Sequence, residues 1–213
     1  MSPRNRLRFV LVVLAILTLA GCFGSKTPMV PVKYYTIEYP PPPGRTASIS
    51  DAVIRVEQFA ASRDYDGRDM ISRPRPFVRE AYRNHRWSEA PVDMVRNFLL
   101  RDIRQSGLFR AALSPGETGV ARYRIDGQVE EFLEIESRDR PVASLAIAIT
   151  LTDTATENPD AGILLQKTYR TTEVIKSKNP GELARGLSAA MAGLSGALLG
   201  DIAAVMKKDR ARP

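Results

Sequence analysis

The two side chains best suited to nucleophilic or metal chemistry each occur once in the chain, as Cys22 and His85. One thiol cannot form an internal disulfide, and one thiol with one imidazole supplies too few ligands for a structural zinc site. The glycines between residues 181 and 200 fall within a predicted helix, and no Lys-Ser/Thr pair follows them to complete a phosphate-binding loop. Neighbouring carboxylates such as Glu130 and Glu131 should face opposite sides of a strand. The sequence therefore predicts a protein that is not an enzyme and uses no cofactor or metal.

Cys22 suits a different chemistry, the attachment of lipid. Three arginines at residues 4–8 precede an apolar run at residues 9–20, which ends at Leu19-Ala20-Gly21-Cys22. A spanning helix needs about 20 apolar residues, whereas the apolar region of a signal peptide needs only about 7–15. The ending resembles the bacterial lipobox, in which small residues let a peptidase bind an extended chain and the thiol accepts diacylglycerol. We predict a signal-peptidase motif at Leu19, Ala20 and Gly21 and lipidation of Cys22; the alternative is a lone buried cysteine at a helix end.

Export changes the meaning of the basic composition. The chain has 213 residues and a formal net charge of +7, and cleavage before Cys22 removes three arginines and leaves +4. An exported protein does not meet the chromosome, so nucleic-acid binding is excluded despite this charge. Several acyl chains, each worth roughly 0.8 kcal/mol per buried methylene, would hold the protein permanently on a membrane. Phe23, rather than aspartate, follows the cysteine. By resemblance to Gram-negative sorting rules, this favours the periplasmic face of the outer membrane.

The hydrophobic pattern divides the chain into four parts. Residues 1–21 form the signal peptide, 22–32 a short tether, 33–206 one domain and 207–213 a basic tail. Within the domain, alternating apolar residues predict strands at 34–39, 52–58, 123–136, 142–153 and 162–175, the last three as an antiparallel meander. Helical spacing predicts one helix that starts near Pro91 and ends at Gly107, and another from Asn179 to residue 206. Residues 60–81 should be a polar loop, with a strand at 77–81.

The C-terminal helix carries an unusual row of small residues. Five of them are spaced by three or four positions: Gly186, Ala189, Gly193, Gly196 and Gly200. Each glycine costs a helix about 1 kcal/mol relative to alanine, so close packing must compensate for the row. Two interpretations remain open: the helix lies tightly on the sheet, or the row is a contact between subunits in a homo-oligomer.

Arginines and aromatic residues gather between Arg68 and Arg86, where the local net charge is +4. Arginine beside aromatic rings suits anionic headgroups or an acidic protein partner. The candidate contact residues are Arg73, Arg75, Arg79, Arg83 and Arg86, interleaved with Tyr82, His85 and Trp87. The alternative is a solvated loop in which Trp87 folds into the core beneath the helix.

The order of these features resembles the ABC-type transport auxiliary lipoprotein family, which includes the lipoprotein of the paraquat-inducible system. The resemblance rests on the lipobox, on Tyr34-Tyr35 and Ile54-Arg55-Val56, and on Tyr82 followed by Arg86-Trp87-Ser88-Glu89-Ala90-Pro91. The later matches are Ser106-Gly107-Leu108-Phe109 and Tyr123-Arg124-Ile125-Asp126-Gly127-Gln128-Val129. The family resemblance implies an α+β fold like the TolB N-terminal domain, with a mixed and mostly antiparallel sheet and two main helices packed on one face. Tyr82, Trp87 and Pro91 would then be structural residues of the family motif.

The resemblance also implies a function. Such a lipoprotein is the outer-membrane-anchored partner of an MCE-type ABC transporter, in complex with an MCE-domain protein and the permease and ATPase, and the system moves phospholipid or other hydrophobic molecules. A first alternative is a lipoprotein that regulates another envelope enzyme, such as a peptidoglycan synthase. The short tether argues against it, because such a regulator must cross the cell wall. A second alternative is direct carriage of a phospholipid in an apolar pocket.

Overall fold

One long strand, β7 (Tyr123–Ile135), organises the sheet in the computed structural model, which describes residues 30–44, 50–137, 139–156 and 162–210. Along one edge, β7 pairs with β8 (Val142–Asp153), which pairs in turn with β9 (Ile163–Val174). Both pairings are antiparallel. The predicted meander is therefore confirmed, and each of its strands agrees with its predicted bounds to within one residue.

Three short strands share the other edge of β7, and all three run parallel to it: β2 (Ser50–Val56), β3 (Ala60–Ala61) and β4 (Asp69–Arg73). The sheet continues outward from them through β6 (Phe109–Leu113), β5 (Glu80–Trp87) and β1 (Lys33–Tyr35). The mixed sheet is as predicted. Five of the eight pairings among the described strands are parallel, and the antiparallel ones are β4–β5, β7–β8 and β8–β9.

A β-bulge in β7 explains why its sequence does not alternate regularly. The register with β8 shifts between Val129 and Glu131, after which Phe132 pairs with Leu145. A bulge inserts one unpaired residue and thereby reverses the in–out order of the residues that follow it. Phe132 and Glu134 therefore point to the same side as Val129, although strict alternation predicts that both should point to the opposite side.

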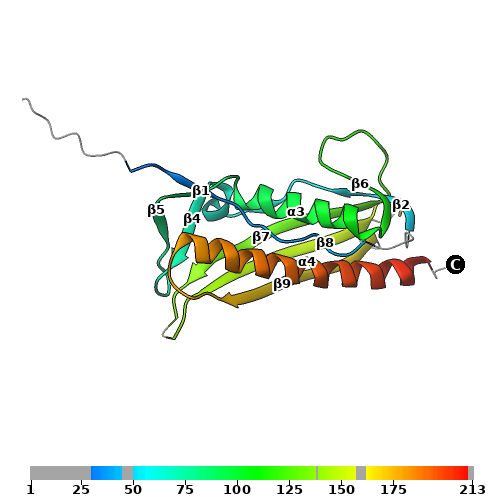
Figure 1. The fold of residues 1–213 in the computed structure, drawn as a ribbon. Helices are drawn as coiled ribbons and strands as arrows, with labels where there is room; N and C mark the ends of the chain where they lie inside the picture. Colours follow the sequence, from blue (N-terminus) through cyan, green and yellow to red (C-terminus); the bar gives the residue numbers. More distant parts are fainter. Residues whose placement is uncertain (1–29, 45–49, 138, 157–161, 211–213) are drawn as a thin grey trace, which may run out of the picture. The chain divides into compact units, whose positions relative to one another are not determined.

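Two helices, α3 (Pro91–Ser106) and α4 (Pro180–Arg210), cover one face of the sheet, as predicted (Figure 1). Helix α3 ends at Ser106 and is capped by Gly107, whose φ of 65° is the left-handed conformation that glycine adopts readily. At the start of α4, the Glu182 amide donates a hydrogen bond of 2.9 Å to Asn179 Oδ1. By length and composition α4 could cross a membrane, but its apolar side is buried in the domain core, as in the core helix of a soluble protein.

The row of small residues on α4 divides into two parts. A Cβ on Gly186 would lie 2.6 Å from Ile175 Cγ2 and 2.7 Å from Ala143 Cβ, so this glycine allows the helix to pack closely on the sheet. A Cβ on Gly193, Gly196 or Gly200 would meet nothing within 4 Å. Tight packing on the sheet therefore accounts for Gly186 only, and the other three glycines lie on the exposed side.

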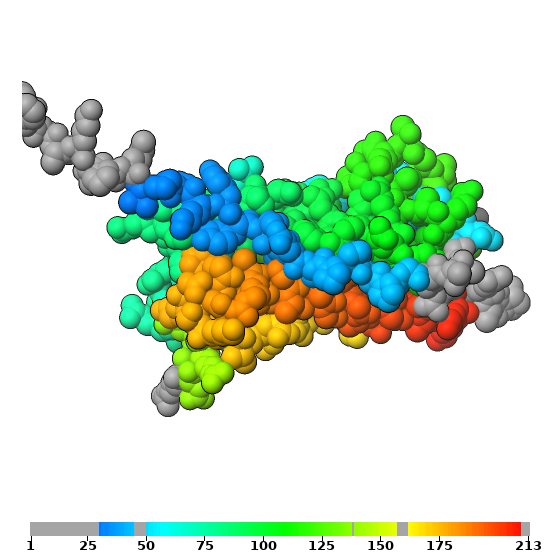
Figure 2. Space-filling view, in the orientation of Figure 1, coloured from blue at the N-terminus to red at the C-terminus, as the bar shows by residue number. Residues whose placement is uncertain are grey.

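The residues after β1 form an N-terminal strap, residues 36–43, instead of the predicted strand at 34–39. Figure 2 shows this segment, in blue, running between α3 and α4. The Glu38 amide donates a hydrogen bond of 2.9 Å to Ser188 Oγ, and Arg101 Nη1 donates one of 3.1 Å to the Tyr39 carbonyl. Strand pairing stops at Tyr35 because the backbone beyond it is bonded by helix side chains.

Residues 60–87 are more ordered than predicted. They form β3, the one-turn helix α2 (Arg63–Asp66), β4 and β5. The predicted strand at 77–81 is wrong, because residues 74–79 form the turn between β4 and β5, and β5 begins only at Glu80. The sequence pattern does not predict the β4–β5 hairpin, because most side chains of β5 are only partly buried or exposed. The strand therefore lacks a continuous apolar face.

Candidate functional site

The predicted lipidation site, Leu19, Ala20, Gly21 and Cys22, lies outside the described residues. Lipidation therefore stays a prediction. The described domain does fix where the chain enters it: Lys33 pairs with His85 and Tyr35 with Trp87, in parallel. Followed back toward its N-terminus, β1 therefore runs toward the start of β5, and so toward the turn between β4 and β5.

Trp87 and Pro91, from the family motif, lie in the core. Trp87 is fully buried, and its ring meets Phe132 edge-on with the centroids 5.2 Å apart. Pro91 is the first residue of α3, where the missing amide proton is tolerated, and it is buried. Both positions join the start of α3 to the sheet, and neither presents a group to a ligand.

Tyr82 connects β5 to a buried carboxylate. Its hydroxyl donates a hydrogen bond of 2.8 Å to Glu134 Oε2, and Glu134 is fully buried with Oε1 unpartnered among the described residues. Burial raises the pKa of Glu134, which favours its protonated form. The sequence pattern does not reveal this residue, because strict alternation places it on the solvent side of β7. The one available signal was that Glu134 follows an irregularity in the apolar–polar alternation of β7.

The two arginines on β5 have different surroundings. Arg86 Nε lies 3.0 Å from Asp69 Oδ1, and Arg86 Nη1 donates to the carbonyls of Tyr82 and His85. Arg86 therefore stabilises the β4–β5 pair. Arg83 is exposed and has no ion pair or hydrogen bond with any described residue.

Arg73, Arg75 and Arg79 come together around a hollow of about 470 Å³ beside the β4–β5 turn. Pro76, Phe77, Ile135 and Glu136 complete its lining. The one carboxylate among these residues, Glu136, forms an ion pair with Lys178. For Arg79, the ion-pair partner is Asp64 at a distance of 3.9 Å, and Arg75 has none in the described part of the chain. The hollow therefore combines an apolar lining with three cations, of which only Arg79 has a carboxylate within ion-pair distance among the described residues.

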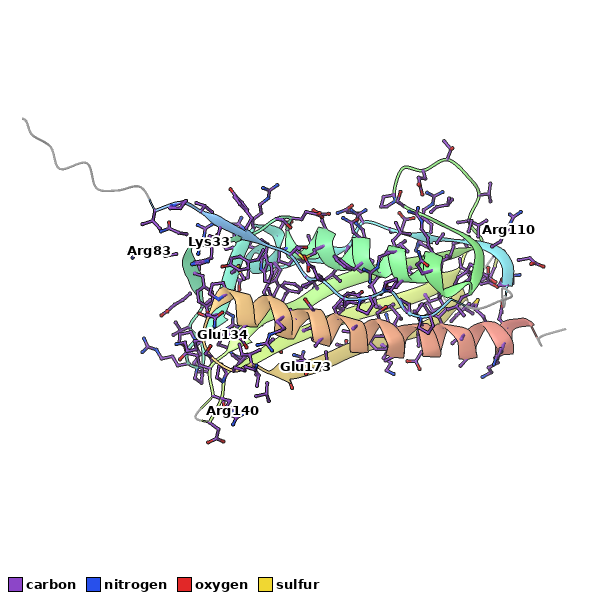
Figure 3. The ribbon with its side chains drawn as sticks, viewed as in Figure 1. Lys33, Arg83, Arg110, Glu134, Arg140 and Glu173 are labelled. Carbon is purple, nitrogen blue, oxygen red and sulfur yellow. The ribbon has the colours of Figure 1, made fainter. Side chains whose placement is uncertain are left out.

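The β4–β5 and β7–β8 turns lie at the same end of the domain, because Arg73 pairs with Ile135 where both strands end. Figure 3 shows Lys33, Arg83 and Arg140 near this end and Arg110 at the opposite end. We call it the basic end, defined by Lys33, Arg73, Arg75, Arg79, Arg83 and Arg140. The predicted cluster of arginines is thus brought together in space, except that Arg86 is engaged within the fold.

Two further hollows lie elsewhere on the domain. One of about 560 Å³, on the β7–β8–β9 meander, is lined mainly by polar or small residues, including Asp126, Gln128, Thr150 and Gln166. The other, of about 270 Å³, lies between Pro42, Pro43 and the exposed glycines of α4. Within the described ranges, no group of three His, Cys, Asp or Glu side chains is arranged to hold a metal ion.

Comparison with known families matches residues 35–198 to the model of the ABC-type transport auxiliary lipoprotein component. The chain belongs to this family. The match runs from the end of β1 to the middle of α4 and so includes almost the whole described domain. The family is one of lipoproteins that serve ABC-type transport, which supports a membrane-anchored place in the bacterial envelope and an auxiliary role in transport. A comparison with curated proteins found no match.

Solved structures support the fold. Protein XCC0632 from Xanthomonas campestris, assigned to the family DUF330, matches with a TM-score of 0.75 at 17% identity, over 85% of this chain and 100% of that one. An uncharacterized protein matches with a TM-score of 0.61 at 13% identity, over 81% and 99%. The hypothetical protein CT253 from Chlamydia trachomatis gives 0.51 at 7% identity, over 73% and 98%. At these identities the likeness concerns the fold alone.

Proposed function

We propose that this auxiliary lipoprotein is a docking subunit, without catalytic activity, of an MCE-type ABC transporter. It is held on the periplasmic face of the outer membrane by acyl chains on Cys22. Its domain binds the periplasmic end of an MCE-domain protein, while the permease and ATPase work at the inner membrane. The system then moves phospholipid or another hydrophobic molecule between the two membranes.

The observation that carries this proposal is the family match over residues 35–198, which covers almost the whole described domain. Two features of the chain agree with it. The sequence offers no usual nucleophile–base pair or metal set, and the tether is short. From Cys22 to Lys33 the chain reaches at most about 36–40 Å, which keeps the domain close to its membrane.

The sheet with two helices on one face is also compatible with a TolB N-terminal-like topology, which we retain as part of the proposal. Direct carriage of a phospholipid is less favoured by the geometry. The hollow of about 560 Å³ has many polar side chains, whereas an acyl chain needs an apolar lining.

A pull-down from detergent-solubilised envelope tests the docking role. The tagged protein should enrich an MCE-domain protein and an ABC permease or ATPase over a bait of unrelated outer-membrane lipoprotein. Recovery of a peptidoglycan synthase instead would refute the proposal and favour a regulator of that enzyme. In parallel, Cys22→Ala should abolish incorporation of radiolabelled palmitate and release the protein from the outer-membrane fraction. Palmitate incorporation that survives this substitution would refute the assigned anchor.

A further inference from the structure

The turn at the basic end holds an aromatic residue in an unfavourable backbone conformation. The Val78 amide bonds to the Arg75 carbonyl at 3.2 Å, so Pro76 and Phe77 are the two central residues of the turn. Phe77 has a φ of 67°, at the position where a type II turn favours glycine. Its side chain is fully exposed and gains no packing within the described domain. Backbone strain of this kind often persists for a functional reason, and here the exposed ring points to a contact outside the chain.

The hollow beside Phe77 should attract anions. Arg73, Arg75 and Arg79 line it, and its one carboxylate, Glu136, is already paired with Lys178. Guanidinium groups match phosphate oxygens in geometry, often with two hydrogen bonds each. Ile135, Pro76 and Phe77 give the same hollow an apolar lining. A phosphate group beside hydrocarbon is the chemistry that these residues recognise together.

The basic end also lies where the chain enters the domain. Lys33 pairs with His85, and from there β5 runs back five residues to Glu80, about 17 Å at the usual rise per residue. Phe77 lies three residues before Glu80, which adds at most about 11 Å, so the turn is still closer to Lys33 than the full reach of the tether. An anchor at Cys22 can consequently bring this turn to the surface of its own membrane.

We propose that the hollow formed by Arg73, Arg75 and Arg79, with Phe77 at its rim, docks on an anionic phospholipid membrane. The arginines bind lipid phosphates, and the Phe77 ring enters the interface between headgroups and acyl chains. The inference rests on the lipid anchor of the proposed function. An acidic protein partner would satisfy the charges, but the short tether places the membrane within reach of this end.

Hydrogen–deuterium exchange on the acylated protein in nanodiscs tests the docking. Nanodiscs of phosphatidylcholine are compared with nanodiscs that also contain about 30% phosphatidylglycerol. We expect amides of residues 75–79 to exchange about tenfold more slowly on the anionic discs, since each basic residue near an anionic surface contributes attraction. The difference should shrink at high salt. Equal exchange on the two kinds of disc overturns the proposal.

Two variants and one control separate the contributions. The triple change Arg73→Glu, Arg75→Glu and Arg79→Glu should abolish the slower exchange of the turn. Phe77→Gly, which suits the turn backbone, should reduce it. The charge-matched control combines Arg110→Glu, Lys207→Glu and Lys208→Glu. All three residues are exposed, and Arg110 lies at the opposite end of the domain (Figure 3). This control should leave the protection of the turn unchanged. Protection that survives the first triple change, or that the control removes equally, overturns the proposal.

Further arms identify the source of the phosphate and separate this proposal from the anchor. Inorganic phosphate that protects the turn on phosphatidylcholine discs to the same extent would show a soluble-anion site and overturn membrane docking. Slower exchange of the turn on outer-membrane vesicles but not on anionic discs would overturn membrane docking and indicate a protein partner. Intact mass reports acylation of the same sample: unacylated protein refutes the anchor, whereas acylated protein with an unprotected turn refutes only the docking.

Discussion

Asp102 joins three parts of the domain, and its contacts allow a quantitative prediction. Its carboxylate is fully buried, and Oδ2 accepts hydrogen bonds from Tyr39 Oη at 2.6 Å and Ser195 Oγ at 2.5 Å. Arg101 Nε donates to Oδ1 at 2.8 Å. Burial and the bond to Asp102 raise the pKa of Tyr39, so this hydroxyl stays protonated as the donor. The N-terminal strap, α3 and α4 thus meet at one carboxylate.

The change Tyr39→Phe removes one hydrogen bond to a charged group and should cost about 1.5–3 kcal/mol of unfolding free energy. For a domain of this size, that corresponds to a fall in Tm of roughly 3–12 °C. The larger change Asp102→Ala leaves three buried or half-buried donors without an acceptor and should cost about 3–5 kcal/mol. Urea and thermal unfolding, followed by circular dichroism on the same preparations, measure both effects.

The matched control is Tyr34→Phe, because Tyr34 lies in β1, is 62% exposed, and its hydroxyl has no hydrogen-bond partner among the described residues. It should change stability by less than about 0.5 kcal/mol. Tyr39 and Ser195 share one oxygen, so the double variant Tyr39→Phe with Ser195→Ala should deviate from additivity by at least about 0.5 kcal/mol. Equal effects of Tyr39→Phe and Tyr34→Phe, or full additivity in the double variant, would refute the shared-carboxylate reasoning.

Three other predictions concern local features. Because burial raises the pKa of Glu134 above its unfolded value, its contribution to stability should fall as pH rises between the two values. Glu134→Gln should therefore stabilise the protein more at pH about 7.5 than at about 4.5. Urea unfolding midpoints at the two pH values measure the effect. An equal effect at both would contradict a raised pKa of Glu134. Gly186→Ala should destabilise the protein by about 1–3 kcal/mol through overpacking against Ala143 and Ile175. Gly193→Ala should instead stabilise it by about 0.5–1 kcal/mol. Tm changes of the same sign for both variants would contradict the close packing of Gly186 on the sheet. Phe77→Gly should raise stability by about 1 kcal/mol by relieving the positive φ, and a loss of stability would show that the ring packs on the domain.

Sequence patterns predicted the elements that bury a continuous apolar face. The meander of β7, β8 and β9 and the helices α3 and α4 fall in this class, since period and end signals agree there. The patterns failed for β4, β5 and β6, which are short and carry few apolar residues in alternation. They also failed after the bulge in β7, because one inserted residue reverses the in–out order without changing composition.

For the candidate site, the sequence identified the residue types but not their arrangement. Charge and the interleaved aromatic residues identify the arginines between 73 and 86, whereas the separation of Arg86 from the others depends on its pairing with Asp69. The hollow depends on the parallel pairing of Arg73 with Ile135, a contact between distant parts of the chain. No local sequence pattern encodes such a pairing, so the residues that line the hollow could not be predicted from the sequence.

The shared edge of β7 bears on the order in which the chain can fold. Strands β2, β3 and β4 precede β7 by many residues, and each needs it as a neighbour. The N-terminal strap likewise needs α4, because the Glu38 amide donates its hydrogen bond to Ser188 Oγ. A chain that emerges from a translocon N-terminus first therefore cannot complete its first half until its second half has arrived. Most of the polypeptide should therefore remain unfolded until β7 and α4 are both available for pairing and packing.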